Sequence, residues 1–299
     1  MDRNGEASRA GYVIGQAEFR ARPLEPALYL VATPIGNLSD ITVRALETLA
    51  AADIVACEDT RVTRVLLDRY GIARRTTPYH EHNAAEAGAR LVEALKEGRS
   101  VALVSDAGTP LVSDPGYRLV EQALAAGIRV VPIPGASALL SALAAAGLPT
   151  DAFLFAGFLP VKAGQRRSRL GELAEVPATL VFYESPRRLA DSLAAMAEVL
   201  GDRSAAIARE LTKTFEEFRR APLAVLAAHY AEAGAPKGEV VVCVGPPGAV
   251  VPGAEDVDAL LASLVDELGA SRAASEAARR TGLKKSDLYR RLMDLRGDG

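Results

Sequence analysis

The amino-acid sequence predicts an α/β protein with two sheet-containing domains and a small helical module at its C-terminal end. Short apolar runs alternate with helical patterns across 27–148, which is the βαβ rhythm of a parallel sheet covered by helices. The apolar runs of 149–248 are more aromatic and alternate with polar residues, as in a mixed or antiparallel sheet. A Pro- and Gly-rich linker at 246–253 separates this part from the helical module at 254–299.

In the first domain, each predicted strand is a short apolar run and each predicted helix has apolar residues at helical spacing. The predicted strands span 28–34, 53–59, 100–108 and 129–135. The predicted helices span 41–52, 60–71, 84–98, 115–127 and 136–147. We expect Asp40 to cap the first of these helices and Gly71 to end the second.

The same patterns locate the elements of the second domain and of the C-terminal module. The predicted strands of the second domain span 151–160, 177–185, 204–211, 214–220 and 238–246, and its helices span 163–174, 186–200 and 222–233. In the C-terminal module, 273–295 has the spacing of a helix, a turn at Gly282 and a second helix with Ser286 as its N-cap.

Composition and the chain ends narrow the class of protein. Residues 1–26 lack periodicity, so we expect a flexible tail, and their acidic residues do not fit a secretion signal. No stretch approaches the roughly 20 apolar residues of a membrane span. Cys57 and Cys243 each lie inside an apolar run, as buried thiols of a reducing compartment do. The sequence therefore predicts a cytoplasmic protein without a membrane segment.

Three loops follow first-domain strands and contain Gly and Pro, at 32–37, 105–110 and 134–138. In open α/β sheets, ligands bind at the carboxyl edge of the strands, and glycine lets the backbone come close to them. These loops suit a nucleoside ligand, with Asp106 or Thr109 holding its polar groups. The sequence lacks the glycine-rich fingerprint of dinucleotide sites and that of P-loops, and the residues around Ser137 do not form a nucleophile elbow.

Two other clusters have alternative interpretations. His80, Glu81 and His82 have the spacing of a metal pair, but no Cys is near, so we favour a polar loop and predict no metal. Glu58 and Asp59 stand at the end of the second predicted strand. They could perform acid–base chemistry, or they could cap the next helix and pair with a neighbouring arginine.

The net charge of −3 excludes a general polycation, so any contact with nucleic acid must come from local basic patches. One such patch is the run of Lys162, Arg166, Arg167 and Arg169, which could also be a solvated helix face. Residues 271–296 contain eight basic residues against three acidic ones, whereas 249–270 contain five acidic residues and no basic one. This asymmetry favours nucleic-acid binding over a purely structural helical cap. The predicted contacts there are Lys284, Lys285, Arg290 and Arg291.

Seven motifs together resemble a known family. In chain order they are LYLVATPIGNLSDIT, ACEDTR, SDAGTPLVSDPG, PGASAL, GFLP, FYESPRR and ARELTKTFEE. They are similar to those of the tetrapyrrole-methylase-like (class III) S-adenosylmethionine methyltransferases, and within that family to the ribosomal RNA small-subunit methyltransferase I branch. The resemblance covers about 27–247, and the C-terminal module resembles the helix-turn-helix module of that branch.

The resemblance implies a two-domain fold with S-adenosylmethionine in the cleft between the domains, and a homodimer. It also implies 2′-O-methylation of a cytidine in the decoding region of 16S rRNA. By motif, the residues implied for the cofactor are Pro34, Ile35, Gly108, Thr109, Val112, Ser137, Ala138, Tyr183 and Ala208.

A ribose hydroxyl is a poor nucleophile, so a base or a hydrogen-bond acceptor should assist it. Asp59, Glu58 and Glu184 are the candidates, with Lys162 or Lys213 lowering the pKa of the hydroxyl. Two rival functions are C-methylation of a tetrapyrrole and RNA binding without catalysis. The basic patches argue against the first, and the intact cofactor loops argue against the second.

Overall fold

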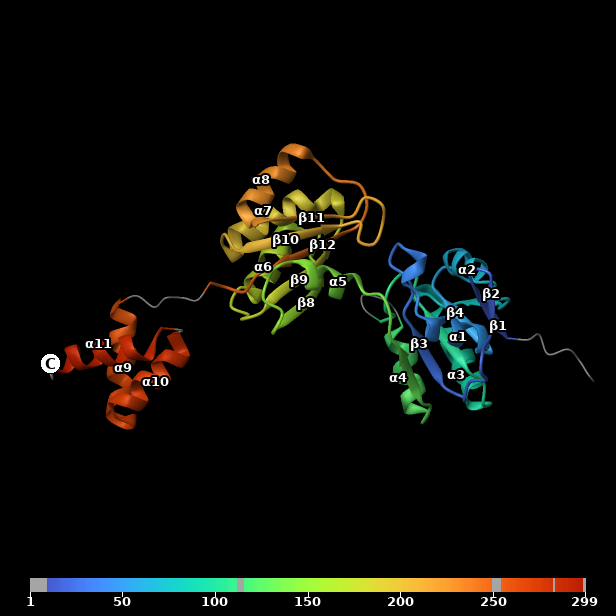
Figure 1. Cartoon of the computed structure of the whole chain (residues 1–299), viewed down its shortest axis with the longest axis horizontal. Coiled ribbons are helices and arrows are strands. Elements are labelled where there is room, and N and C mark those ends of the chain that lie inside the picture. Colours follow the sequence, from blue (N-terminus) through green and yellow to red (C-terminus); the bar gives the residue numbers. More distant parts are fainter. Residues whose placement is uncertain (1–9, 112–115, 249–253, 282, 298–299) are drawn as a thin grey trace, which may run out of the picture.

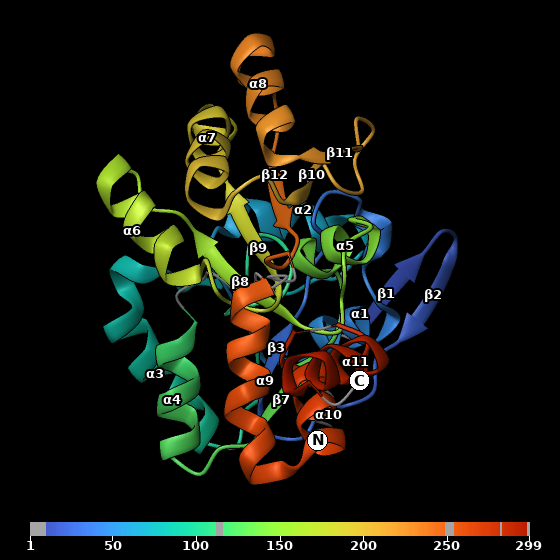
Figure 2. The same cartoon turned by 90° about the vertical axis from the view of Figure 1, so that its left-hand side faces the viewer.

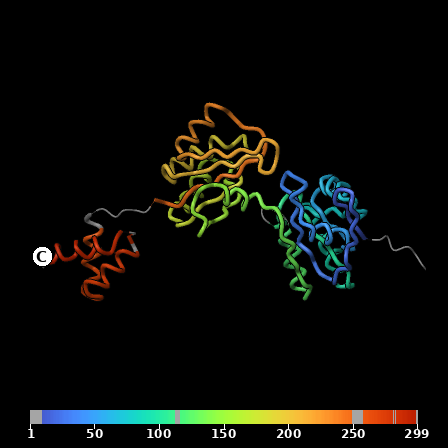
Figure 3. The backbone as a smooth tube through the Cα atoms, in the orientation of Figure 1, coloured from blue at the N-terminus to red at the C-terminus, as the bar shows by residue number. Residues whose placement is uncertain are grey.

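The computed structural model describes residues 10–111, 116–248, 254–281 and 283–297, and it has the α/β architecture expected from the sequence (Figure 1). Two five-stranded sheets form two domains, and three helices form the C-terminal module. The chain passes from the first sheet to the second after strand β7 (Figure 3). No helix in the described parts of the chain is long and apolar enough to cross a membrane.

The first sheet is entirely parallel, with the strand order β5-β4-β6-β3-β7. Its strands are β3 (Leu28–Val31), β4 (Ile54–Cys57), β5 (Thr76–Pro78), β6 (Val101–Val104) and β7 (Val130–Ile133). The sequence analysis did not predict β5. This strand is only three residues long and is polar. It is a strand because it pairs with the edge of β4.

Helices cover both faces of the first sheet. Two helices, α1 (Val43–Ala51) and α2 (Thr60–Arg69), contribute to one apolar core. On the other face, α3 (Ala84–Lys96) and α4 (Tyr117–Ala125) contribute to a second core. The N-cap of α1 is Thr42, whose side chain accepts the N–H of Ala45, and not Asp40 as expected. Asp40 instead ends a short 3₁₀ turn, so the helix begins two residues later.

The N-terminal segment is more ordered than the flexible tail expected over 1–26. Strands β1 (Gly11–Ile14) and β2 (Ala17–Arg20) form an antiparallel hairpin. Tyr12 is buried in the first core, and the N–H of Val13 donates to the carbonyl of Tyr70 at 2.8 Å. The strands are too short for their sequence to show the alternation of apolar and polar residues. The packing of Tyr12 holds the hairpin in place.

The second sheet is mixed, as the sequence predicted, with the strand order β11-β10-β12-β9-β8. Its strands are β8 (Phe153–Phe158), β9 (Thr179–Glu184), β10 (Ser204–Arg209), β11 (Glu217–Pro222) and β12 (Val240–Val244). Strands β8 and β9 are parallel, and the other neighbours are antiparallel.

Two sets of helices enclose the second sheet (Figure 2). Helices α6 (Ala163–Leu173), α7 (Leu189–Leu200) and α8 (Leu223–Ala233) pack on one face. The other face, with Val181, Val241 and Cys243, packs against α5 (Ala138–Ala145). Helix α5 follows the last strand of the first sheet, so this helix joins the two domains rather than covering only the first.

The C-terminal module contains three helices, α9 (Ala254–Leu268), α10 (Ala270–Thr281) and α11 (Lys285–Arg296), around an apolar core of their own. The two predicted helices correspond to α10 and α11. The N-cap position of α11 is Lys284, so Ser286 lies inside the helix and does not cap it. Gly282, predicted as the turn, lies outside the described residues.

Candidate functional site

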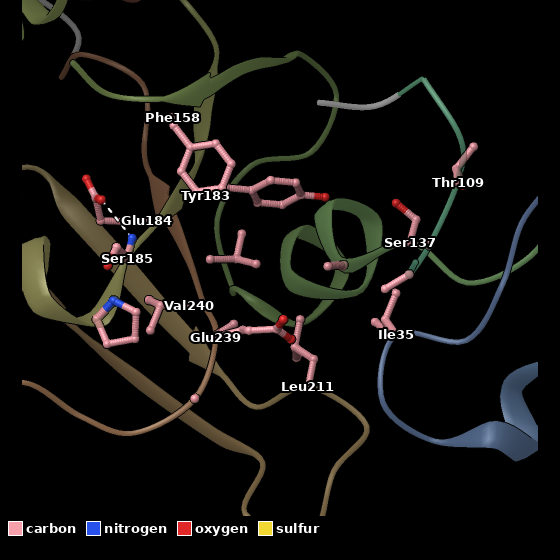
Figure 4. A pocket seen from close by; sticks show the side chains of 17 residues that line it. Ile35, Thr109, Ser137, Phe158, Tyr183, Glu184, Ser185, Leu211, Glu239 and Val240 are labelled. Carbon is pink, nitrogen blue, oxygen red and sulfur yellow. Dashed lines mark hydrogen bonds between the residues drawn. The ribbon is translucent and has the colours of Figure 1, made fainter. Parts of the chain in front are cut away.

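A cavity of about 370 Å³ lies between the two domains, within the size range of pockets that bind small ligands (Figure 4). From the first domain and α5 it is lined by Ile35, Ala107, Gly108, Thr109, Ser137 and Ala138. From the second domain it is lined by Phe158, Tyr183, Glu184, Ser185, Pro186, Ala208, Leu211, Gly238, Glu239, Val240 and Val241.

The three loops at the carboxyl edge of the first sheet meet at this cavity. Thr33 and Gly108 exchange backbone hydrogen bonds of 2.9 and 3.0 Å, which join the first loop to the second. The hydroxyl of Thr109 donates to the carbonyl of Ala136 at 3.3 Å, which joins the second loop to the third. Parallel strands place their carboxyl ends at one edge, so the fold itself assembles the loops.

Seven of the predicted cofactor residues lie in the lining of the cavity. They are Ile35, Gly108, Thr109, Ser137, Ala138, Tyr183 and Ala208. Pro34 and Asp106 are adjacent to lining residues but do not line the cavity, and Val112 lies outside the described residues. The carboxylate of Asp106 accepts the backbone N–H of Asp59 at 2.9 Å, so it connects the end of β6 to the end of β4.

The second domain supplies an aromatic wall. The ring of Tyr183 meets those of Phe155 and Phe158 edge-on, with centroid distances of 4.8 and 5.7 Å. Burial raises the pKa of Tyr183, so its phenol is protonated at neutral pH. Figure 4 shows Phe158 and Tyr183 across the cavity from Ser137 and Thr109. A planar apolar ligand group could pack against such a wall.

Glu184 lines the cavity, but both oxygens of its carboxylate are already paired with neighbouring groups. Its side chain has no exposed surface, and it accepts the N–H of Ser185 at 2.7 Å and the hydroxyl of Ser192 at 2.6 Å. The guanidinium of Arg188 pairs with it at 2.6 Å and also donates to the carbonyl of Leu159. Glu184 therefore helps to fix the shape of the cavity wall, and both oxygens of its carboxylate are paired with neighbours.

The predicted catalytic residues Asp59, Glu58 and Lys162 do not line the cavity. Asp59 is the N-cap of α2, and its carboxylate accepts the N–H of Arg61 at 2.8 Å. The hydrogen bonds from the Arg61 side chain and backbone lower the pKa of Asp59 to about 2. Lys162 is exposed at the start of α6. Of the two interpretations of Asp59, the structure shows the helix cap paired with an arginine.

The sequence analysis missed several lining residues, chiefly Leu211, Gly238 and Glu239. Leu211 is part of the ARELTKTFEE motif, so the resemblance already contained a signal for it. Gly238 and Glu239 precede β12 in a stretch without a recognisable motif, and only the antiparallel pairing of β12 with β10 brings them to the cavity.

The predicted RNA contacts differ in their exposure. Arg166 is buried, because it shares with Leu170 and Leu173 the face of α6 that packs on the domain core, and this burial does not favour the predicted contact with RNA. Arg167 and Arg169 are exposed and pair with Glu198 and Glu172.

In the C-terminal module, the exposed cations among the predicted contacts are Lys284, Lys285 and Arg290. Arg291 is half-buried and forms a bidentate pair with Asp258 of α9 at 2.5 and 3.0 Å. Its guanidinium therefore connects α11 to α9.

The His80–Glu81–His82 cluster forms the start of a helical turn before α3. The rings of His80 and His82 are 6.0 Å apart. Within the described residues, no group of three or more His, Cys, Asp or Glu side chains could hold a metal ion. Cys57 and Cys243 are both buried free thiols.

Comparison with known families gives two matches. Residues 27–227 match the family described as Tetrapyrrole (Corrin/Porphyrin) Methylases. Residues 251–296 match the RsmI C-terminal HTH domain.

The curated relatives cover nearly the whole chain. The chain is 70% identical to ribosomal RNA small subunit methyltransferase I of Mesorhizobium japonicum, over 96% of this chain and 100% of that protein. It is 50% identical to the protein of the same name from Pseudomonas aeruginosa, over 90% of this chain and 98% of that protein.

Among solved structures, the fold is similar to that of cobalt precorrin-4 methyltransferase, with a TM-score of 0.56 and 20% identity over 74% of this chain and 95% of that one. It is also similar to uroporphyrin-III C-methyltransferase from Thermus thermophilus complexed with S-adenyl homocysteine. There the TM-score is 0.51 and the identity 21%, over 73% of this chain and 96% of that one.

Proposed function

Since this chain belongs to the tetrapyrrole (corrin/porphyrin) methylase family and to its ribosomal RNA small subunit methyltransferase I branch, we propose that it methylates 16S rRNA. The reaction is transfer of a methyl group from S-adenosylmethionine to the 2′-hydroxyl of a cytidine in the decoding region. The observation that supports it most directly is the cavity between the domains, where seven residues of the family's cofactor motifs converge.

The residues of the cavity fit S-adenosylmethionine. Gly108 lies against Ile35, and a Cβ built on it would lie 3.3 Å from the Ile35 side chain, so the lack of a side chain leaves space there. Ser137 and Thr109 offer hydroxyls, and the loops offer backbone groups, to the polar parts of a nucleoside. The sulfonium of the cofactor supplies a good leaving group, so the protein's main task is to align the hydroxyl with the methyl group.

A group that accepts the hydrogen of the ribose hydroxyl should also face the cavity. Asp59, Glu58 and Lys162 are outside the lining, and the carboxylate of Glu184 is occupied. Glu239 lines the cavity, its side chain is 78% exposed, and it pairs with Lys213 through its Oε2, so we assign the acceptor role to its Oε1. Such assistance contributes a factor of about 10² to 10⁴ in rate.

The basic residues of the C-terminal module would bind the RNA substrate. Lys284, Lys285 and Arg290 are exposed on a module with its own core, which leaves their side chains available to phosphates. Arg167, Arg169 and Lys162 lie on the second domain and could add further phosphate contacts. A protein that acts on ribosomal RNA works in the cytoplasm, which is where we place it.

The direct test uses labelled S-adenosylmethionine with 30S subunits, or free 16S rRNA, from cells that lack this modification. Nucleoside analysis should find the label in 2′-O-methylcytidine. Label in a different nucleoside would contradict the position, and label only in a tetrapyrrole would support the rival C-methyltransferase. Binding of RNA without any transfer, under conditions where the cofactor binds, would support a non-catalytic protein.

We also propose a homodimer, from membership of the family. Light scattering at micromolar concentration should give twice the mass of 31.4 kDa. A monomer mass under those conditions would contradict this assembly.

A further inference from the structure

The loop between β10 and β11 reaches from the second domain to the first. The backbone N–H of Asn37, in the first cofactor loop, donates to the hydroxyl of Thr212 at 3.1 Å. The stem of Lys213 lies directly on Gly36, where an added Cβ would be 2.6 Å from the Lys213 Cγ. Thr212 and Lys213 of this loop therefore contact Asn37 and Gly36 of the first domain.

The ammonium of Lys213 is held by two carboxylates. It donates to Glu210 at 2.7 Å and to Glu239 at 2.9 Å, and the N–H of Glu239 donates to Glu210 at 3.0 Å. Burial alone would lower the pKa of Lys213, but the hydrogen bonds to Glu210 and Glu239 and the negative charges of these two residues together outweigh burial and raise it. Lys213 is therefore charged at neutral pH. Its ion pair with Glu239 connects this loop to the start of β12.

The backbone of this loop is strained on both sides of a cavity residue. Glu210 and Thr212 have φ values of +50° and +66°, and Leu211 between them lines the cavity. Non-glycine residues in this region are strained, and they persist where surrounding contacts hold them. The side chain of Glu210 also lies on Gly238, where an added Cβ would meet it at 2.2 Å. The contacts of Lys213 and Glu210 keep the backbone of this loop in its strained conformation.

We propose that Lys213 is a positioning residue that braces the two domains across the cofactor cavity, an inference that rests on the proposed function. The interdomain brace consists of Gly36, Asn37, Glu210, Thr212, Lys213 and Glu239. It fixes the first cofactor loop relative to Leu211 and Glu239. Lys213 acts through these neighbours, because it does not itself line the cavity.

The first test needs no cofactor. In the ligand-free protein, Lys213→Met keeps the apolar stem and removes the charge. Amide hydrogen exchange at Asn37 should become about tenfold faster, because the loop that holds its acceptor is released. Lys213→Arg should restore slow exchange, since a guanidinium can bind two carboxylates. The control is Lys96→Met, which removes an exposed lysine paired with Glu93 on α3. If the amide of Asn37 exchanges in Lys213→Met at the rate found in the wild type, the proposed interdomain brace is wrong.

The second test measures the affinity of S-adenosylhomocysteine by calorimetry. Lys213→Met should weaken binding about tenfold, with a thermal midpoint close to that of the wild type, and Lys213→Arg should recover most of the affinity. Gly36→Ala should also weaken binding, because its added methyl displaces the Lys213 stem while its φ lies outside the left-handed region. Gly164→Ala is the control, since a Cβ there meets nothing within 4 Å.

The two tests separate the possible failures. Faster exchange with unchanged affinity in both Lys213→Met and Gly36→Ala would overturn the link between the brace and the cofactor. If the wild-type protein does not bind S-adenosylhomocysteine, the proposed function is wrong. In that case the exchange at Asn37 still decides whether Lys213 holds the domains together.

Discussion

At the scale of single residues, Gly108 is the point where two cofactor loops and the cavity meet. Its φ of +78° is a conformation that glycine adopts freely and other residues avoid. It exchanges backbone hydrogen bonds with Thr33, and its Cα faces the side chain of Ile35. Both the backbone angle and the lack of a side chain are therefore required at this position.

We expect Gly108→Val to reduce the affinity for S-adenosylhomocysteine by at least about tenfold, or 1.4 kcal/mol. The left-handed backbone angle adds a destabilisation of about 1–2 kcal/mol. Gly127→Val is a matched control, because its φ is +72° but a Cβ there meets nothing within 4 Å. Calorimetry and thermal unfolding of both variants should show similar losses of stability but a loss of affinity only for Gly108→Val. Equal affinity in both folded variants would refute the role of this loop.

Glu184 shows how a buried charge can shape a site without reacting. We expect Glu184→Gln to lower the free energy of unfolding by about 3 kcal/mol, because it leaves the buried donors of Arg188 and Ser192 without their anion. Glu198→Gln removes a carboxylate from an exposed pair with Arg167 and should cost less than about 1 kcal/mol. Urea unfolding measures both. A loss for Glu184→Gln no larger than for Glu198→Gln would contradict this account.

At the scale of elements, the helix caps explain two differences between expectation and structure. Both Asp40 and Thr42 are acceptable N-cap residues, and the sequence alone did not choose between them. The structure begins α1 after Thr42, because the chain first makes the 3₁₀ turn Leu38–Asp40, which Asn37 caps. At α2 the sequence left open whether Asp59 caps the helix or performs acid–base chemistry, and the structure shows the cap, because the Asp59 carboxylate accepts the N–H of Arg61.

The cap of α2 predicts a dependence of stability on pH. The pKa of Asp59 is lowered to about 2 in the folded protein, below the value of about 3.9 for an unfolded aspartate. Its contribution is therefore present above about pH 4 and is lost as the pH falls towards about 2. The stability difference between wild type and Asp59→Asn should shrink as the pH falls from about 4 to about 2 in urea unfolding. A difference that is constant over this range would show that the charge of Asp59 contributes nothing.

Helix α11 contains two adjacent arginines with different roles. Arg290 is exposed, so Arg290→Glu should weaken RNA binding and reduce its salt dependence by about one phosphate contact. Arg291 pairs with Asp258, so Arg291→Glu should place two like charges together and loosen α11 from α9. Filter binding over a range of salt, with circular dichroism of each variant, distinguishes the two effects. Unchanged RNA binding in a folded Arg290→Glu protein would contradict the predicted contact.

At the scale of the whole molecule, catalysis and RNA capture are assigned to separate folded parts. The cavity is built from residues before Gly248, and the C-terminal module has its own core between α9, α10 and α11, with eight buried apolar residues among those that the structure describes. Arg291 and Asp258 connect helices within that module. A module that packs on itself can be removed without opening the domains that hold the cavity.

Truncation after Gly248 should therefore leave the affinity for S-adenosylhomocysteine unchanged, while methylation of 16S rRNA falls steeply. The lost cations supply sequence-independent affinity that weakens as the salt concentration rises, so the defect should be largest at low salt and smaller at higher salt. Calorimetry and the labelled-methyl assay on the same preparation measure both effects. Full methylation by the truncated protein would show that the module is a structural cap, and that Lys162, Arg167, Arg169 and the cavity select the RNA.

The sequence by itself determined the α/β fold class and the loops that form the cofactor side of the cavity. Alternating patterns depend on local periodicity, and the carboxyl ends of parallel strands must share one edge, so the loops at Ile35, Gly108 and Ser137 could be expected to meet. The resemblance added Tyr183 and Ala208 from the second domain.

Only the tertiary structure decided which residues close the cavity and which charges are free. Glu239 and Lys213 are 26 residues apart in sequence, and the pairing of β12 with β10 brings them together. Arg166 belongs to a basic run that suggests a surface cation, but it lies on the buried face of α6. Asp59 has the sequence of a catalytic acid, but it caps a helix outside the cavity. For Glu239 and Lys213 the deciding contact is between residues far apart in the chain, and for Arg166 it is the helix face that is buried. For Asp59 it is the position of α2 outside the cavity. Local patterns do not encode any of these.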